Sequence, residues 1–146
     1  MPRFFTLQQA EQLLPVVESA IRDAILLKTQ YQEAEEELQN FSRRVTMLGG
    51  VLVDHSKIAD RKSHRESIVL RLKEAIEKIQ DRGCVIKDLD IGLVDFPTLL
   101  RGEEVYLCWK LGERGIGFWH GVQEGFQGRK QIDREFLDHH QGELPN

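Results

Sequence analysis

The chain has 146 residues, of which 40% are hydrophobic and 30% are charged, and its net charge is −4 at pH 7. This length and composition predict one soluble domain with a modest core. No apolar run approaches the ~18 residues that a membrane span needs, and the N-terminus lacks a signal peptide's apolar segment. We therefore expect a cytoplasmic protein without a membrane segment, in which Cys84 and Cys108 are buried free thiols.

The first predicted element is a long helix with an apolar seam. Alternating steps of three and four residues from Ala10 to Leu48 reach an apolar side chain every time, which is the spacing of a coiled-coil helix. Thr6 and Gln9 form a capping-box pattern at its start, and Pro15 predicts a kink or a restart. Such a helix spans about 58 Å, so part of it should project as an arm.

A second helix is predicted from about residue 57 to 82, after a turn at Gly49-Gly50 and with Gly83 as its C-terminal stop. Its predicted seam consists of Val69, Leu72, Ile76 and Ile79. A short connection favours antiparallel neighbours, so residues 6–82 should form a helical hairpin. In that hairpin the acidic residues 33–37 lie roughly opposite Arg65, Arg71 and Lys73.

The hairpin should gather cations at its free tip, where acidic residues are few. The cations are Arg43, Arg44, Lys57, Arg61, Lys62 and Arg65. They predict a surface for an anionic protein partner; phosphate binding and a merely solvated tip are the alternatives. The acidic net charge and the lack of a recognition-helix motif argue against a dedicated nucleic-acid binder.

After Cys84 the hydrophobic period changes from helical to two. A strand is predicted within 84–96 and closed by Pro97, and a second over 103–110 has Val105, Leu107 and Trp109 on one face. A third follows over 116–120, which makes an antiparallel meander over 84–120. Residues 121–146 are predicted to be loop with a short helix near 133–139. The predicted fold is α+β: a long antiparallel coiled-coil helical hairpin packed at its base on a small antiparallel β-meander, as a single domain over 1–146.

Polar and aromatic residues crowd together between residues 95 and 129. The candidate site residues are Asp95, Arg101, Trp109, Glu113, Trp119, His120 and Arg129. An apolar wall with arginines and a titratable pair is typical of a small-molecule site. In that hypothesis His120 is the acid, base or ligand, Glu113 is its carboxylate partner, and Arg101 or Arg129 holds an anion. The alternative is that the tryptophans are sheet core and the charges are cross-strand ion pairs.

A metal site would use His120 and Glu124 with Glu113, or the pair His139-His140 with Asp138. No CxxC motif occurs, and no two histidines stand at helical ligand spacing, so no metal is assigned and the cofactor stays unknown. There is also no nucleophile elbow. The glycines of residues 112–117 lie between two strands, which predicts a hairpin turn rather than a phosphate loop.

Several segments resemble a small bacterial family catalogued as a domain of unknown function, number twenty-two-oh-three. They are 92–97 (GLVDFP), 104–113 (EVYLCWKLGE), 118–120 (FWH) and 125–129 (GFQGR), with the N-terminal pattern from Phe5 to Pro15. The resemblance covers nearly the whole chain and implies no activity. Because it is carried by polar and aromatic residues, it strengthens the hypothesis of a site in the sheet. The turn at 113–117 departs from the family by its extra glycines.

Two functional hypotheses follow. The leading one is a cytoplasmic, non-enzymatic interaction or scaffold module that uses its coiled-coil arm as a spacer or docking surface. Its broad apolar base and open sheet edges predict a homodimer. The competing hypothesis is a small-molecule or metal site, catalytic or not, around His120, Glu113 and Arg129.

Overall fold

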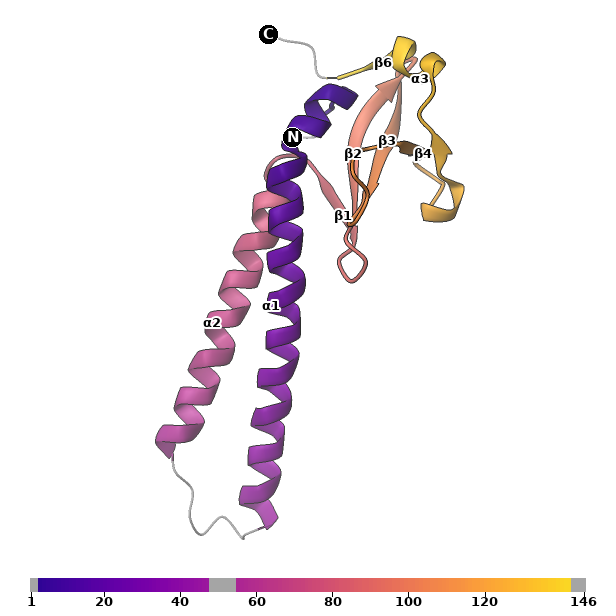
Figure 1. Cartoon of the computed structure of the whole chain (residues 1–146). Coiled ribbons are helices and arrows are strands. Elements are labelled where there is room, and N and C mark those ends of the chain that lie inside the picture. Colours follow the sequence, from indigo (N-terminus) through magenta and orange to yellow (C-terminus); the bar gives the residue numbers. More distant parts are fainter. Residues whose placement is uncertain (1–2, 48–54, 143–146) are drawn as a thin grey trace.

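A computed structural model, which describes residues 3–47 and 55–142, shows an α+β fold (Figure 1). Helices α1 (Leu7–Met47) and α2 (His55–Gln80) form an antiparallel hairpin, and a small sheet lies beside its upper part. The lower part of the hairpin extends beyond the sheet as an arm (Figure 1). The predicted fold class is confirmed; the Gly49-Gly50 turn and Leu48 lie outside the described residues. No helix within the described ranges is long and apolar enough to cross a membrane.

The start of α1 follows the predicted capping box. The Gln9 amide N–H donates to the Thr6 hydroxyl at 3.1 Å, and the Thr6 amide donates to the Gln9 side-chain oxygen at 3.0 Å. Pro15 lies inside the helix, so the predicted restart does not occur. Instead, the upper end of α1 is bent relative to the rest (Figure 1), as expected where proline removes a backbone hydrogen bond.

The α1 seam is buried largely as predicted, and the predicted α2 seam is correct at Leu72 and Ile79 but not at Val69. Val69 is 44% exposed, whereas Ile68, Ala75 and Ile79 are buried. The spacing of these three residues, continued toward the tip, reaches Arg65 and Arg61. Two predicted positions were thus one residue too late, and the two seam positions toward the tip are arginines, which the apolar pattern does not reveal.

Both seam arginines make contacts with α1. The Arg65 guanidinium donates to the Glu35 carboxylate at 3.0 Å, within the predicted acidic cluster. The Arg61 guanidinium lies over the Phe41 ring, 4.7 Å from its centroid. The hairpin therefore uses two of the six predicted tip cations internally.

The sheet is antiparallel, and most of it is a meander. In spatial order its strands are β1 (Val85–Asp88), β2 (Leu93–Leu100), β3 (Glu103–Lys110), β4 (Phe118–Gly121) and β5 (Lys130–Gln131), and β6 (His140–Gln141) also pairs with β2. The single strand predicted within 84–96 is thus two strands joined by a tight turn. Gly92 makes that turn at φ +68°, and a Cβ there would lie 2.5 Å from the Leu111 Cβ.

Pro97 does not close a strand but lies in the middle of β2, opposite Tyr106. On the other side of β2 the N-terminal segment fills the gap between β1 and β6. There the Phe5 amide donates to the Pro97 carbonyl at 2.8 Å. The neighbouring segment bonds only to the carbonyl of residue 97, so the missing N–H of proline is tolerated inside the strand.

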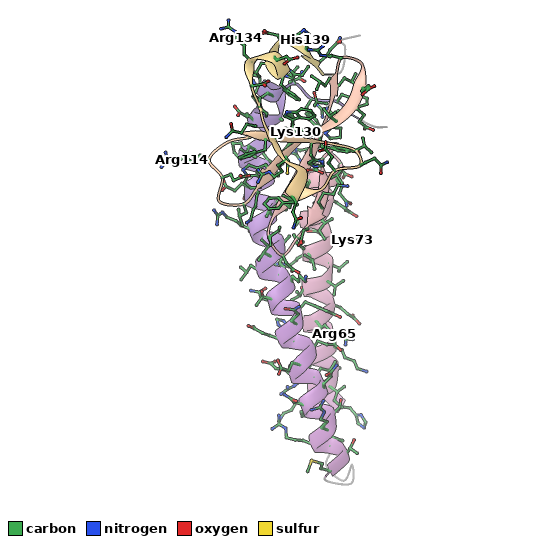
Figure 2. The ribbon with its side chains drawn as sticks, turned by 90° about the vertical axis from the view of Figure 1, so that its right-hand side faces the viewer. Arg65, Lys73, Arg114, Lys130, Arg134 and His139 are labelled. Atoms are coloured by element: carbon green, nitrogen blue, oxygen red, sulfur yellow. The ribbon has the colours of Figure 1, made fainter. Side chains whose placement is uncertain are left out.

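Residues 121–142 contain more regular secondary structure than predicted. It contains the 3₁₀ turn η1 (Phe126–Gly128), the two-residue strands β5 and β6, and helix α3 (Arg134–His139). The predicted short helix is confirmed, and the Asp133 carboxylate caps it by accepting from the Phe136 amide at 2.8 Å. Figure 2 shows this segment and the sheet in front of the upper part of the hairpin.

The two faces of the sheet differ in character because side chains alternate along each strand. One face carries Val94, Phe96, Leu107 and Trp109, which belong to the same apolar core as the base of α1. Asp95 and Cys108 fall on the opposite face and are nevertheless fully buried. This second face holds the candidate site.

Candidate functional site

Three strands bring Asp95, Cys108 and His120 together. Asp95 of β2 lies directly opposite Cys108 of β3, and His120 of β4 lies opposite Tyr106, two residues before Cys108. Residues two apart share a face, so the register places all three side chains on one side of the sheet. Their exposed fractions are 0%, 0% and 4%. We call these three residues the Asp–Cys–His cluster.

The hydrogen bonds of His120 define the chemistry of the cluster. Its Nε2 lies 3.0 Å from both carboxylate oxygens of Asp95, and its Nδ1 lies 2.8 Å from the carbonyl oxygen of Gly121. A carbonyl and a carboxylate are acceptors only, whereas a neutral imidazole carries a single N–H. Both ring nitrogens of His120 thus face acceptor groups, although a neutral ring has only one hydrogen to donate.

Cys108 completes the cluster. Burial raises the pKa of its thiol to about 12, and the neighbouring Asp95 carboxylate adds to this increase. In the metal-free protein the thiol is thus protonated at neutral pH and is no nucleophile. One ligand atom from each of Asp95, Cys108 and His120 lies within 4.8 Å of the other two.

Glu113 and Arg129 form a second polar unit beside the cluster. The Arg129 guanidinium donates to both Glu113 carboxylate oxygens at 2.8 Å, and the side chains are only 11% and 26% exposed, respectively. The Glu113 carboxylate also accepts from the Lys110 amide at 2.7 Å. The guanidinium lies 4.0 Å from the Phe118 ring centroid and 4.8 Å from that of Phe126. Glu113 thereby holds the Arg129 guanidinium through one terminal nitrogen, whereas its buried Nε has no hydrogen-bond partner in the described part of the chain.

The remaining candidates are distributed around the sheet. Trp109 is fully buried in the core, and its indole N–H donates to the Glu113 carbonyl at 3.0 Å. Trp119 packs against Phe136, with ring centroids 5.1 Å apart. Arg101 lies in the β2–β3 turn, where it pairs with the exposed Glu135. The sheet-core alternative is therefore correct for Trp109, and Arg101 belongs to a different surface.

The structure also rearranges the residue sets considered as metal ligands. The partner of His120 is Asp95, whereas Glu113 pairs with Arg129 and Glu124 accepts from Lys130 at 2.8 Å. His140 has a structural contact, because its Nε2 accepts from the Leu7 amide at the start of α1 at 3.0 Å. Sequence reasoning missed Cys108, although alternation in 103–110 already placed it on the face opposite the core residues.

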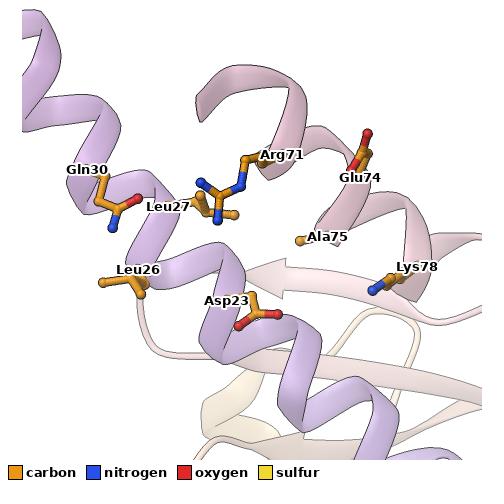
Figure 3. A pocket seen from close by; sticks show the side chains of 8 residues that line it. All are labelled: Asp23, Leu26, Leu27, Gln30, Arg71, Glu74, Ala75 and Lys78. Atoms are coloured by element: carbon orange, nitrogen blue, oxygen red, sulfur yellow. The ribbon is translucent and has the colours of Figure 1, made fainter. Parts of the chain in front are cut away.

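A groove runs between the two helices on the side of the hairpin away from the sheet (Figure 3). It is lined by Asp23, Leu26, Leu27, Gln30, Arg71, Glu74, Ala75 and Lys78. A second hollow, lined in part by Val16 and Ser19, shares Asp23 and Lys78 with it, so the two form one depression along α1. We call this the hairpin groove. Leu26 and Val16, which line it, are 58% and 40% exposed.

Fold and site together define a small α+β protein in which a helical hairpin supports a sheet with a buried Asp–Cys–His cluster. Residues 3–132 match the sequence profile of the family described as "Uncharacterized conserved protein (DUF2203)", and the chain belongs to that family. The match includes the hairpin, the cluster and the Glu113–Arg129 pair. Neither a curated protein nor a solved structure matches the chain.

Proposed function

We propose that this protein is a cytoplasmic, non-enzymatic interaction module whose coiled-coil hairpin joins a second copy of the chain to form a homodimer. The observation that carries the proposal is the hairpin groove, which exposes Leu26 and Val16 on the side of the hairpin away from the sheet. Packing this groove, in which Leu26 lies among charged side chains, against the same groove of a second copy would place four helices side by side.

The charges of the groove favour a second copy of the chain over a partner whose surface carries charges of one sign. Asp23 and Glu74 lie in the same groove as Arg71 and Lys78, so acids and bases balance. A two-fold axis brings the same patch of both subunits together, and it can place the acids of one against the bases of the other. A strongly acidic or basic partner would gain no such match.

The far end of the arm is proposed as the surface for an anionic partner. Arg43, Arg44 and Lys62 are exposed there, as is Lys57. Arg61 and Arg65 are half-buried against α1, so they contribute to hairpin stability as well as to charge. The arm would then act as a spacer that carries its docking surface away from the dimeric base.

The dimer is tested by sedimentation equilibrium of the protein and of two leucine variants. Leu26 and Leu70 are 58% and 61% exposed, but only Leu26 lines the groove. We expect Leu26→Asp to raise the dimer dissociation constant at least tenfold, whereas Leu70→Asp leaves it unchanged. A monomer at every concentration, or equal effects of the two variants, would overturn the proposal.

The tip is tested with poly-L-glutamate as the probe at two salt concentrations. Arg43→Glu/Arg44→Glu should lose binding that the unchanged protein shows at low salt, because attraction between exposed charges is screened by salt. Lys73→Glu, an exposed reversal farther along α2, is the control. If the control loses as much binding as the tip variant, the tip is not a docking surface.

A further inference from the structure

We propose that Asp95, Cys108 and His120 bind one divalent transition-metal ion, with zinc as the expected metal. Their ligand atoms all lie within 4.8 Å of one another on one face of the sheet. Ligand atoms around a tetrahedral zinc ion are about 3–4 Å apart, given metal–ligand bonds of about 2.0–2.3 Å. Small side-chain movements, without a change of strand register, therefore bring the three groups around one ion.

The donor types select the metal. A thiolate and an imidazole are ligands that zinc prefers, and a carboxylate oxygen is its other common protein ligand. Calcium and magnesium prefer oxygen atoms alone, so a sulfur and a nitrogen among three donors disfavour them. Three protein ligands leave one position of a tetrahedral ion for water or a small anion.

His120 is already oriented as a metal ligand. Its Nδ1 lies 2.8 Å from the Gly121 carbonyl, so Nδ1 must carry the hydrogen of the neutral ring. The remaining nitrogen, Nε2, then presents its lone pair toward the Asp95 carboxylate. A histidine that donates one N–H to a backbone carbonyl and offers the other nitrogen to the ion is the usual arrangement in metal sites. A metal ion at Nε2 would thus stand between two groups that, with a neutral ring in this tautomer, share no hydrogen.

Charge balance also fits a divalent ion in this buried place. A carboxylate and a thiolate together carry two negative charges, which a divalent ion neutralises while the imidazole stays neutral. Binding releases the proton of the Cys108 thiol, so the metal-bound cluster carries no net charge. Neutrality matters because the cluster is at most 4% exposed and an unbalanced buried charge would be costly.

The surroundings suggest that metal binding is coupled to folding. The Glu113–Arg129 pair is anchored beside Cys108, whose carbonyl lies 3.5 Å from an Arg129 guanidinium nitrogen. The same guanidinium lies over the rings of Phe126 and of Phe118, the residue opposite Cys108 in β4. An ion would therefore enter most readily before the C-terminal segment closes over the sheet.

The experiment is refolding of the full chain with Co²⁺ or Zn²⁺, followed by removal of unbound metal. We expect one equivalent of zinc by native mass spectrometry, a melting temperature raised by several degrees, and a thiolate-to-cobalt charge-transfer band in the Co²⁺ form. Cys108→Ser should abolish that band. Cys84→Ser is the matched control, because burial likewise raises the pKa of Cys84 to about 12 but Cys84 belongs to the apolar core and not to the cluster.

Two further variants keep the test decisive if Cys108→Ser does not fold. Asp95→Asn and His120→Gln should each lower the zinc affinity at least tenfold. A wild-type chain that retains no zinc and gives no cobalt–thiolate band would overturn the proposal, as would a band that Cys84→Ser removes and Cys108→Ser leaves intact. The inference does not rest on the hairpin proposal, since dimerisation is measured separately through Leu26 and Leu70.

Discussion

Removal of the Glu113 charge should destabilise the sheet far more than an exposed ion pair would suggest. Glu113→Gln keeps an acceptor for the Lys110 amide but leaves the Arg129 guanidinium, 11% exposed, without its counter-charge. Breaking a buried ion pair costs about 3–5 kcal/mol. Because 26% of the Glu113 side chain reaches solvent, we expect a smaller loss of about 2 kcal/mol in unfolding free energy.

The assay is urea unfolding together with thermal melting. A loss of about 2 kcal/mol lowers the melting temperature of a chain of this size by about 4–8 °C. The control is Glu135→Gln, which breaks the exposed Arg101–Glu135 pair, with side chains 56% and 69% exposed, and should cost no more than about 0.5 kcal/mol. If the two variants were equally stable, burial would not be what strengthens the Glu113–Arg129 pair.

Three other changes have contrasting expected outcomes. Gly92→Ala, with φ +68° and Leu111 in the way, should destabilise by about 2 kcal/mol or more, whereas Gly102→Ala, with φ +84° and open space, should cost only about 1 kcal/mol; urea unfolding measures both. Burial raises the pKa of Cys84 from 9.0 to about 12, so the native state keeps the thiol proton to a higher pH than the unfolded state does. The free energy of unfolding should therefore fall as the pH rises above 9, and Cys84→Ala should make this fall less steep in pH-dependent unfolding. Arg65→Leu/Glu35→Leu should melt no lower than the unchanged protein, while Arg65→Leu alone should melt lower because Glu35 is then half-buried without a partner.

The sequence was sufficient for the types and order of the main elements. The apolar spacing in α1, the Thr6–Gln9 capping box, the Gly83 stop and the alternation in β3 are local signals that tertiary structure did not override. The α2 seam was predicted correctly at Leu72 and Ile79, but its positions at Arg61 and Arg65 were not found because charged residues are typical of a surface. The strand that contains Pro97 was predicted to end too early, also because of a tertiary contact. The neighbour at this position is the N-terminal segment, remote in sequence, and it bonds to the Pro97 carbonyl, so the strand continues without a Pro97 N–H.

The residues of the candidate site were named from the sequence, but their pairing was not. Asp95, His120, Glu113 and Arg129 were all identified, yet the expected His120–Glu113 pair is instead two separate pairs, Asp95–His120 and Glu113–Arg129. Which residues meet depends on the register of β2, β3 and β4. Sequence separation carries little information on that register. Cys108 was missed because a lone cysteine in a strand gives no ligand-spacing signal.

The most direct test of the proposed function is the distance between two copies of the same groove residue. Ser19 lines the hairpin groove, and a spin label on Ser19→Cys can be measured by double electron–electron resonance. The native thiols should stay unlabelled because both are buried. A homodimer through the groove predicts a short, well-defined distance between the labels of two copies, which disappears when Leu26→Asp is added. If the folded protein gave a resonance signal that contains no distance between the labels of two copies, the proposed dimer would be contradicted.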